Sequence, residues 1–219
     1  MPNIIIRSSF LAKERASFSP FSLFSNKSFL VLVLASLGVS IIHQIYFLQT
    51  GPFLSSIGIK DSAIGPAMTI GQFAEIATMA YLGYFLKRLG FKKVITIGIM
   101  AYFARYVIFG TSFLPVWVMV ISQAFHGFCF AFFFAAGFIY VDKLADDDVR
   151  HSAQTVFGII IFGGGPVMGG WLSGKLQEIN TVAGVFDYSN FWYTLAGIGL
   201  VTGILFLSFF KTQLNNSNE

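Results

Sequence analysis

The stretch AIGPAMTIGQFAEIATMAYLGYFL, residues 63–86, decides the fold of this chain. It is long enough to cross the hydrocarbon core of a bilayer as an α-helix. Its only strongly polar side chains are Gln72 and Glu75. An ionisable side chain in the middle of a membrane span is unfavourable and is usually retained to move ions or solutes. The stretch therefore predicts a membrane helix that carries a functional carboxylate.

The whole chain has the composition of a membrane protein. Of its 219 residues 55% are hydrophobic and only 11% are charged, far from the balance of a soluble domain. None of its apolar segments shows the alternating pattern of an outer-membrane barrel. We therefore predict an all-α polytopic protein in a lipid bilayer. The six expected transmembrane helices are 28–49, 63–86, 94–110, 116–141, 152–176 and 189–210.

Basic residues gather in every second connection between the expected spans. They are concentrated in an N-terminal arm, 1–27, in the connections 87–93 and 142–151, and at the start of the tail, 211–219. Because basic connections tend to stay in the cytoplasm, we expect both termini there, with the six-helix part at 28–210. This topology accounts for the net charge of +4, so we expect no nucleic-acid partner.

Gln72 and Glu75 are three residues apart, so they share one face of a helix. An amide that donates and accepts hydrogen bonds then lies beside a carboxylate that can gain and lose a proton. The alternative is a structural carboxyl that is buried and paired. We favour solute binding and proton coupling, because intramembrane carboxylates seldom lack a function.

Arg105 is the other charged side chain inside an expected span. Because it lies toward the outer end of that span, its side chain could snorkel to the headgroups. It could instead pair with Glu75 or belong to an outer gate. His43 could relay protons, although a lone histidine more often bonds a neighbouring helix.

Polar and aromatic side chains of two other spans could line a cavity. Gln44 and Tyr46 offer hydrogen bonds and a ring, but residues two apart cannot share a helix face. Phe130 and Phe133 belong to an aromatic run that could stack on a flat ring. Such dense phenylalanine is more often packing material or lipid-facing.

The remaining sequence features indicate helix packing and no catalytic chemistry. Glycines recur at small-residue spacing within 163–174 and at Gly199 and Gly203, so we expect the fifth and sixth spans to pack closely. No set of nucleophile, base and orienting group is evident, and neither a cofactor motif nor a metal-ligand spacing occurs. We therefore expect neither an enzyme nor a bound cofactor or metal.

Several motifs resemble a family of transporters. The stretch GYFLKRLGFKK, residues 83–93, is similar to the basic loop signature of the major facilitator superfamily, although Lys87 stands where an acid is common. Further motifs, in this order and spacing, resemble the C-terminal half of the nucleoside:proton symporter family within that superfamily. They are GPFL at 51–54, GQFAEI at 71–76, HG at 126–127, FFF at 132–134, GFIYVDK at 137–143 and Arg150 to Gln154.

The resemblance implies a twelve-helix transporter whose two six-helix halves rock around a central cavity. This chain would supply the C-terminal half, and its opening residues resemble the central linker, so a missing N-terminal half is the expected partner. The resemblance also implies that Gln72 faces the nucleoside and that Glu75 faces the nucleoside and the coupling proton. Ala131 stands where some members carry a second acid, which leaves the proton stoichiometry open.

The expectation is nucleoside:proton symport by alternating access, in a bacterial inner membrane. The expected substrate-binding residues are Gln44, Tyr46, Gln72, Glu75, Phe130 and Phe133, and the proton-coupling residues are Glu75 and Arg105. A six-span protein that dimerises into a full pathway is one alternative. A degenerate half that transports nothing is the other. Which nucleoside is carried does not follow from the sequence.

The expected topology can be tested by cysteine labelling. A cysteine placed at Ser55, Ser112 or Ser189 should react with an impermeant maleimide added outside the cell, and one at Gly90 or Ala145 should not. The reverse labelling pattern would show that the basic connections face outward.

Overall fold

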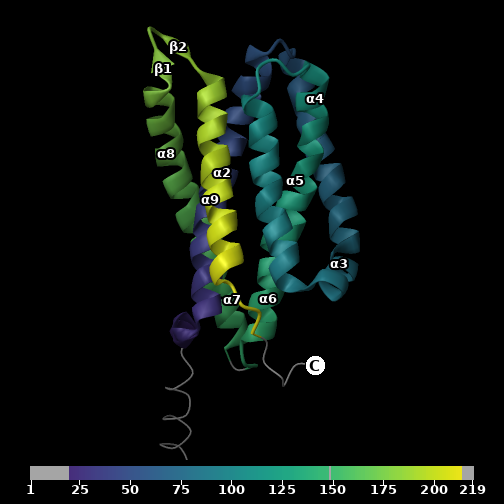
Figure 1. Ribbon diagram of the computed structural model, residues 1–219, viewed down its shortest axis with the longest axis vertical. Coiled ribbons are helices and arrows are strands. Elements are labelled where there is room, and N and C mark those ends of the chain that lie inside the picture. Colours follow the sequence, from purple (N-terminus) through teal and green to yellow (C-terminus); the bar gives the residue numbers. More distant parts are fainter. Residues whose placement is uncertain (1–19, 148, 214–219) are drawn as a thin grey trace, which may run out of the picture.

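A computed structural model describes residues 20–147 and 149–213 as a bundle of long helices (Figure 1). The fold is all-α and polytopic, as the sequence predicts. Its elements are η1 (Pro20–Ser25), α2 (Lys27–Ser56), α3 (Asp61–Gly110), α4 (Val116–Ile121), η2 (Ser122–Ala124), α5 (Phe125–Phe128), η3 (Cys129–Ala135), α6 (Ala136–Leu144), α7 (Arg150–Ile159), η4 (Ile160–Gly164), α8 (Gly165–Ile179), β1 (Thr181–Val182), β2 (Val185–Phe186) and α9 (Tyr188–Phe209).

Helix α3 crosses the bundle twice. Five helical segments of the described chain are long and apolar enough to span a membrane, and α3 is one of them, with 50 residues. Gly90 interrupts it with φ 76° and ψ 164°. Figure 1 shows the chain reversing there between a first arm, residues 61–89, and a second arm, residues 91–110. The reversal gives six spans, as predicted.

The fourth and fifth spans are composite. The fourth runs from α4 to α6 and includes the π-helical turn η3, and the fifth joins α7 to α8 through the π-helical turn η4. Pro166 follows η4 at the start of α8, so the fifth span is interrupted where the sequence places glycines and a proline. π-Helical turns widen a helix locally and are frequent at functional sites.

The glycines of the fifth and sixth spans do not join those spans to each other, so that expectation was wrong. Gly169 of α8 lies against Gln44 of α2. Gly203 of α9 lies against Met100 in the second arm of α3. Small-residue spacing reveals that a helix has a face for close packing, but it does not reveal which neighbour lies there.

A short hairpin between α8 and α9 was not predicted from the sequence. β1 and β2 pair antiparallel, with Thr181 opposite Phe186. The two turn residues, Ala183 and Gly184, both have positive φ, 51° and 79°. This is the backbone that a tight two-residue hairpin requires, and glycine adopts it without strain.

The basic connections lie together at one end of the bundle. The start of α2, the turn at Gly90, the α6–α7 connection and the end of α9 share this end, and the hairpin lies at the other (Figure 1). Tyr140 Oη donates to the Gln213 carbonyl at 3.0 Å. Ser28 Oγ donates to the Lys211 carbonyl at 2.5 Å. These bonds tie the segment after α9 to α6 and α2.

Any residue other than glycine at position 90 should lower the stability of the protein. Gly90→Ala places a side chain at φ 76° and ψ 164°, a backbone conformation that is essentially restricted to glycine, and should lower the free energy of unfolding by about 1–3 kcal/mol. The thermal midpoint of the purified protein in lipid nanodiscs should fall by about 2–4 °C for each kcal/mol. For the same reason, Lys87 and Arg88, which are exposed, are better cysteine positions than Gly90 for topology mapping.

Gly83→Ala is the matched control. Gly83 lies in the first arm of the same helix, and a Cβ there meets nothing within 4 Å. Because alanine favours a helix over glycine, the midpoint should stay or rise. Equal losses in the two variants would contradict the role of positive φ.

Candidate functional site

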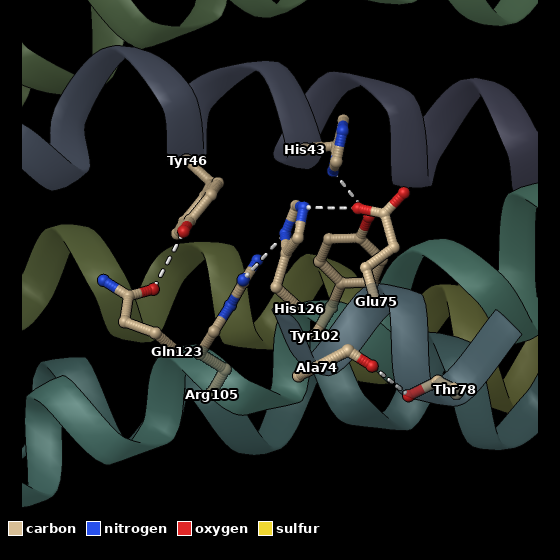
Figure 2. A network of polar contacts seen from close by, with 9 residues as sticks. All are labelled: His43, Tyr46, Ala74, Glu75, Thr78, Tyr102, Arg105, Gln123 and His126. Atoms are coloured by element: carbon tan, nitrogen blue, oxygen red, sulfur yellow. Dashed lines mark hydrogen bonds and ion pairs between the residues drawn. The ribbon is translucent and has the colours of Figure 1, made fainter. Parts of the chain in front are cut away.

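The central feature of the site is the carboxylate of Glu75. It lies at the middle of the first arm of α3 and is partly buried, with 26% of its side chain exposed. Its Oε2 lies 3.6 Å from Nε2 of His126, which comes from α5 in the fourth span (Figure 2). Glu75 thus has one side in contact with the protein interior and another side open.

Two glycines let the first arm and α5 approach closely enough for this contact. A Cβ on Gly127 would lie 2.8 Å from the backbone nitrogen of Glu75, and a Cβ on Gly71 would lie 3.0 Å from Cβ of His126. Real Cβ atoms essentially never lie under 3.0 Å from another heavy atom, so Gly127 has no room for a side chain. The motif GQFAE and the dipeptide His126-Gly127 are therefore two sides of one helix contact.

The second edge of His126 faces a buried cation. Arg105, from the second arm of α3, has no exposed surface, and its Nη1 lies 3.3 Å from Nδ1 of His126. The snorkelling interpretation of Arg105 is therefore wrong. No ion pair between Arg105 and Glu75 is found among the described residues, because His126 lies between the two side chains (Figure 2).

Aromatic rings surround the Arg105 guanidinium. Its Cζ lies 3.8 Å from the centre of the Tyr46 ring and 5.4 Å from the centres of the Tyr102 and Tyr106 rings. A cation over an aromatic face is attracted by the ring quadrupole, more so when it is desolvated. Nε and Nη2 of Arg105 have no hydrogen-bond partner in the described part of the chain, so the three rings, called here the tyrosine cage, supply much of its stabilisation.

The cage is held by hydrogen bonds to other spans. Tyr46 Oη donates to Gln123 Oε1 at 2.8 Å, and Tyr106 Oη donates to the Ile42 carbonyl at 2.7 Å. The hydroxyl of Tyr102 lies 2.6 Å from Nδ1 of His43. These bonds join α2, the second arm of α3 and the fourth span around one charge.

The structure brings together only some of the predicted site residues. Glu75, Arg105 and Tyr46 belong to one cluster, but Tyr46 is only 1% exposed and already contacts Arg105 with its ring. Phe130 borders the cluster, with its ring centre 6.5 Å from that of His126. Gln72 lies one helical turn before Glu75 and is exposed.

Two predicted residues lie away from this cluster. Gln44 packs against Gly169 of α8, as its separation from the face of Tyr46 requires. Phe133 is 1% exposed and its backbone lies against Gly98 in the second arm of α3. Their roles in substrate binding stay predictions.

Both histidines are absent from the expected site residues, although His43 had an interpretation as a proton relay. His43 does bond a neighbouring helix through Tyr102, as its simpler interpretation expected, but it is not alone. Its ring stacks on that of His126, with centres 5.6 Å apart and planes 13° apart. A signal was present in the sequence, because His126 and Gly127 form one of the motifs on which the family resemblance rests.

This arrangement suits reversible protonation and hydrogen bonding of a solute. Glu75 can exchange a proton on its open side, and as a carboxylate it can accept hydrogen bonds from hydroxyl or N–H groups. The exposed amide of Gln72 adds a donor and an acceptor close by. The half-buried ring of Phe130 adds an apolar surface.

A family model and two named relatives point to one family. The model of the family described as "Nucleoside H+ symporter" matches residues 8–215. The nucleoside permease NupG of Escherichia coli (strain K12) is 30% identical over 207 residues, which cover 87% of this chain and 48% of NupG. The xanthosine permease of the same organism is 28% identical over 215 residues, which cover 91% of this chain and 50% of the permease.

A solved structure shows the same likeness in three dimensions. The crystal structure of the nucleoside transporter NupG matches this fold with a TM-score of 0.79 at 29% identity, and the match covers 92% of this chain and 55% of that chain. This chain therefore spans about half the length of the curated relatives it matches.

The tyrosine cage can be tested at Tyr46. Tyr46→Phe keeps the ring under Arg105 but leaves the buried Gln123 amide without its donor, which should lower the free energy of unfolding by about 1–3 kcal/mol. Tyr46→Leu also removes the ring and should cost about 1–2 kcal/mol more. Thermal unfolding in nanodiscs measures both, and equal midpoints for the two variants would show that the ring contributes nothing to holding Arg105.

Proposed function

Because this chain belongs to the nucleoside H+ symporter family, we propose that it forms one six-helix half of a proton-coupled nucleoside transporter. The observation that carries the proposal is the half-buried Glu75 carboxylate at the middle of a membrane span, with one open side. A group in that position can meet a solute and a proton from the same cavity.

The proposal that the chain is a half rests on length and on exposure. The chain covers about half of the length of two relatives that are named a nucleoside permease and a xanthosine permease. The first arm of α3 leaves large apolar side chains exposed beside Glu75, among them Phe73 and Ile76 at 69% and 68%. A second six-helix half would cover this face and close a cavity over Gln72 and Glu75, and rocking of the two halves would give alternating access.

Each residue has a separate role in this proposal. Glu75 exchanges the coupling proton and holds polar groups of the nucleoside, and Gln72 forms hydrogen bonds with the nucleoside. Phe130 stacks on the base, because it borders the cluster and is only partly buried. Arg105 contacts the Nδ1 edge of His126, away from Glu75, and does not contact the solute.

The proposed location is a bacterial inner membrane with both termini in the cytoplasm. Its support is that the basic connections share one end of the bundle with the start of α2 and the end of α9 (Figure 1). Basic segments next to spans are retained on the cytoplasmic side.

The proton role can be tested at Glu75 in cells that also express an N-terminal six-helix half of a family member. Glu75→Gln keeps the size and hydrogen bonding of the side chain but removes its titration. Uphill nucleoside accumulation driven by a pH gradient should fall at least tenfold, and exchange of nucleoside down its own gradient should survive. Radiolabelled nucleoside uptake with and without an uncoupler measures both.

Gln72→Ala is the matched control, because an amide binds but does not titrate. It should weaken apparent nucleoside affinity about tenfold, the equivalent of one lost hydrogen bond, and leave the dependence on the pH gradient in place. Full gradient-driven accumulation in Glu75→Gln would exclude Glu75 as the proton carrier. Uptake by this chain without any second half would favour a homodimer.

A further inference from the structure

The geometry points to His126 as a positioning residue that stabilises the ionised form of Glu75 and passes no proton inward. Arg105 holds the imidazole in one tautomer, which directs an N–H toward the carboxylate. This inference rests on the proposed function in one respect, that Glu75 is the group that takes up the coupling proton.

The tautomer follows from the inventory of donors. A guanidinium has only N–H donors, so Nδ1 of His126, 3.3 Å from Arg105 Nη1, can only be the acceptor of that contact. A neutral imidazole with an accepting Nδ1 carries its hydrogen on Nε2. Nε2 is the atom that lies 3.6 Å from Oε2 of Glu75, so the N–H dipole faces the carboxylate (Figure 2).

The surroundings oppose a second proton on His126. The ring is 3% exposed, and it is stacked between His43 and Tyr46 of α2, with ring centres 5.6 Å and 5.5 Å away. A second positive charge next to Arg105 would be repelled and desolvated. The titratable or charged groups around the contact between Glu75 and His126 are His43 and Tyr46 from α2, Tyr102, Arg105 and Tyr106 from the second arm of α3, and Cys129 from η3.

A histidine that cannot accept a proton is a barrier and not a relay. A proton that reaches Glu75 from the open side has no path through His126, because Nδ1 is occupied by Arg105 and Nε2 already carries hydrogen. When Glu75 becomes neutral, the attraction between the N–H dipole and the carboxylate is lost. His126 therefore sets the pH range in which Glu75 exchanges its proton, and confines that exchange to the open side.

Two substitutions separate the edges of the ring. His126→Asn places an amide where Nδ1 lies, so it can keep the contact with Arg105 but loses the donor for Glu75. His126→Gln extends the amide to the place of Nε2 and can restore that donor. The two variants bury similar polar groups, so a merely structural role would affect them alike.

The readout is the protonation of Glu75 in the full chain in nanodiscs. Infrared difference spectra against Glu75→Gln isolate the carboxyl band and give its midpoint pH. Loss of the N–H donor destabilises the anion, so the carboxyl gains its proton at higher pH. The 3.6 Å contact is a charge–dipole contact and not a hydrogen bond, so we expect His126→Asn to raise the midpoint by about half a unit and His126→Gln to raise it by less than half as much. Equal midpoints in the two variants, shifted or not, would overturn the positioning role.

A measurement on the unmodified chain covers the case in which a variant does not fold. Nitrogen-15 spectra of histidine-labelled protein distinguish the two neutral tautomers and the imidazolium. The chain has three histidines, so selective labelling must assign the signal of His126. That signal should show Nε2–H throughout pH 5–8. An Nδ1–H tautomer or a doubly protonated ring would overturn the inference.

Neither spectroscopic measurement involves nucleoside or uptake. If Glu75→Gln retains gradient-driven accumulation while the infrared and nitrogen-15 results are as expected, the proposed proton coupling fails and the positioning of Glu75 by His126 stands. If Glu75→Gln loses gradient-driven accumulation but the infrared and nitrogen-15 results contradict the expectation, the proton coupling stands and His126 has no part in it.

Discussion

A guanidinium without access to water is the constraint around which this six-span bundle is arranged. Removing such an ion from water costs several kcal/mol even after the protein relaxes, so its surroundings must return most of that free energy. Arg105 obtains it from the tyrosine cage and from the Nδ1 acceptor of His126. Because these partners come from α2, from α3 and from the fourth span, one charge orients side chains across the whole bundle.

The same arrangement explains why small residues stand next to the Glu75 carboxylate. His126 can reach both Arg105 and Glu75 only if α5 and the first arm of α3 lie almost backbone to backbone, and Gly71 and Gly127 leave that space. Helices in a bilayer associate through close packing and interhelical polar contacts, because lipid supplies no hydrophobic driving force between them. Packing and chemistry therefore depend on the same glycines.

The candidate site has a closed side and an open side. On the closed side, Arg105 and His126 are buried and the stacked ring of His43 is half-buried, so protein contacts set the charge and tautomer of His126. On the open side, Glu75 is accessible and Gln72 is exposed. In the proposed function, this wall responds to a solute without admitting protons into the bundle, and a second set of helices closes the cavity over it.

The sequence by itself determined the membrane class, the six spans and the place of the carboxylate, because the length of apolar segments and the cost of an ionisable group in lipid are local properties. The role of glycine at 90 as a helix break is also local, although its positive φ was seen only in the fold. The short hairpin escaped prediction because Ala183 is not a residue that typically takes positive φ.

The tertiary structure alone decided which polar groups meet. Arg105 and His126 are 21 residues apart, and His43 and Tyr102 are 59 apart, and no helical periodicity relates residues on different helices. From the sequence, Arg105 had a snorkelling interpretation and His43 was a lone histidine. Only the packing of α2, α3 and α5 placed an imidazole between the cation and the carboxylate, because side-chain partners across helices depend on how each helix is rotated and how closely its neighbours approach.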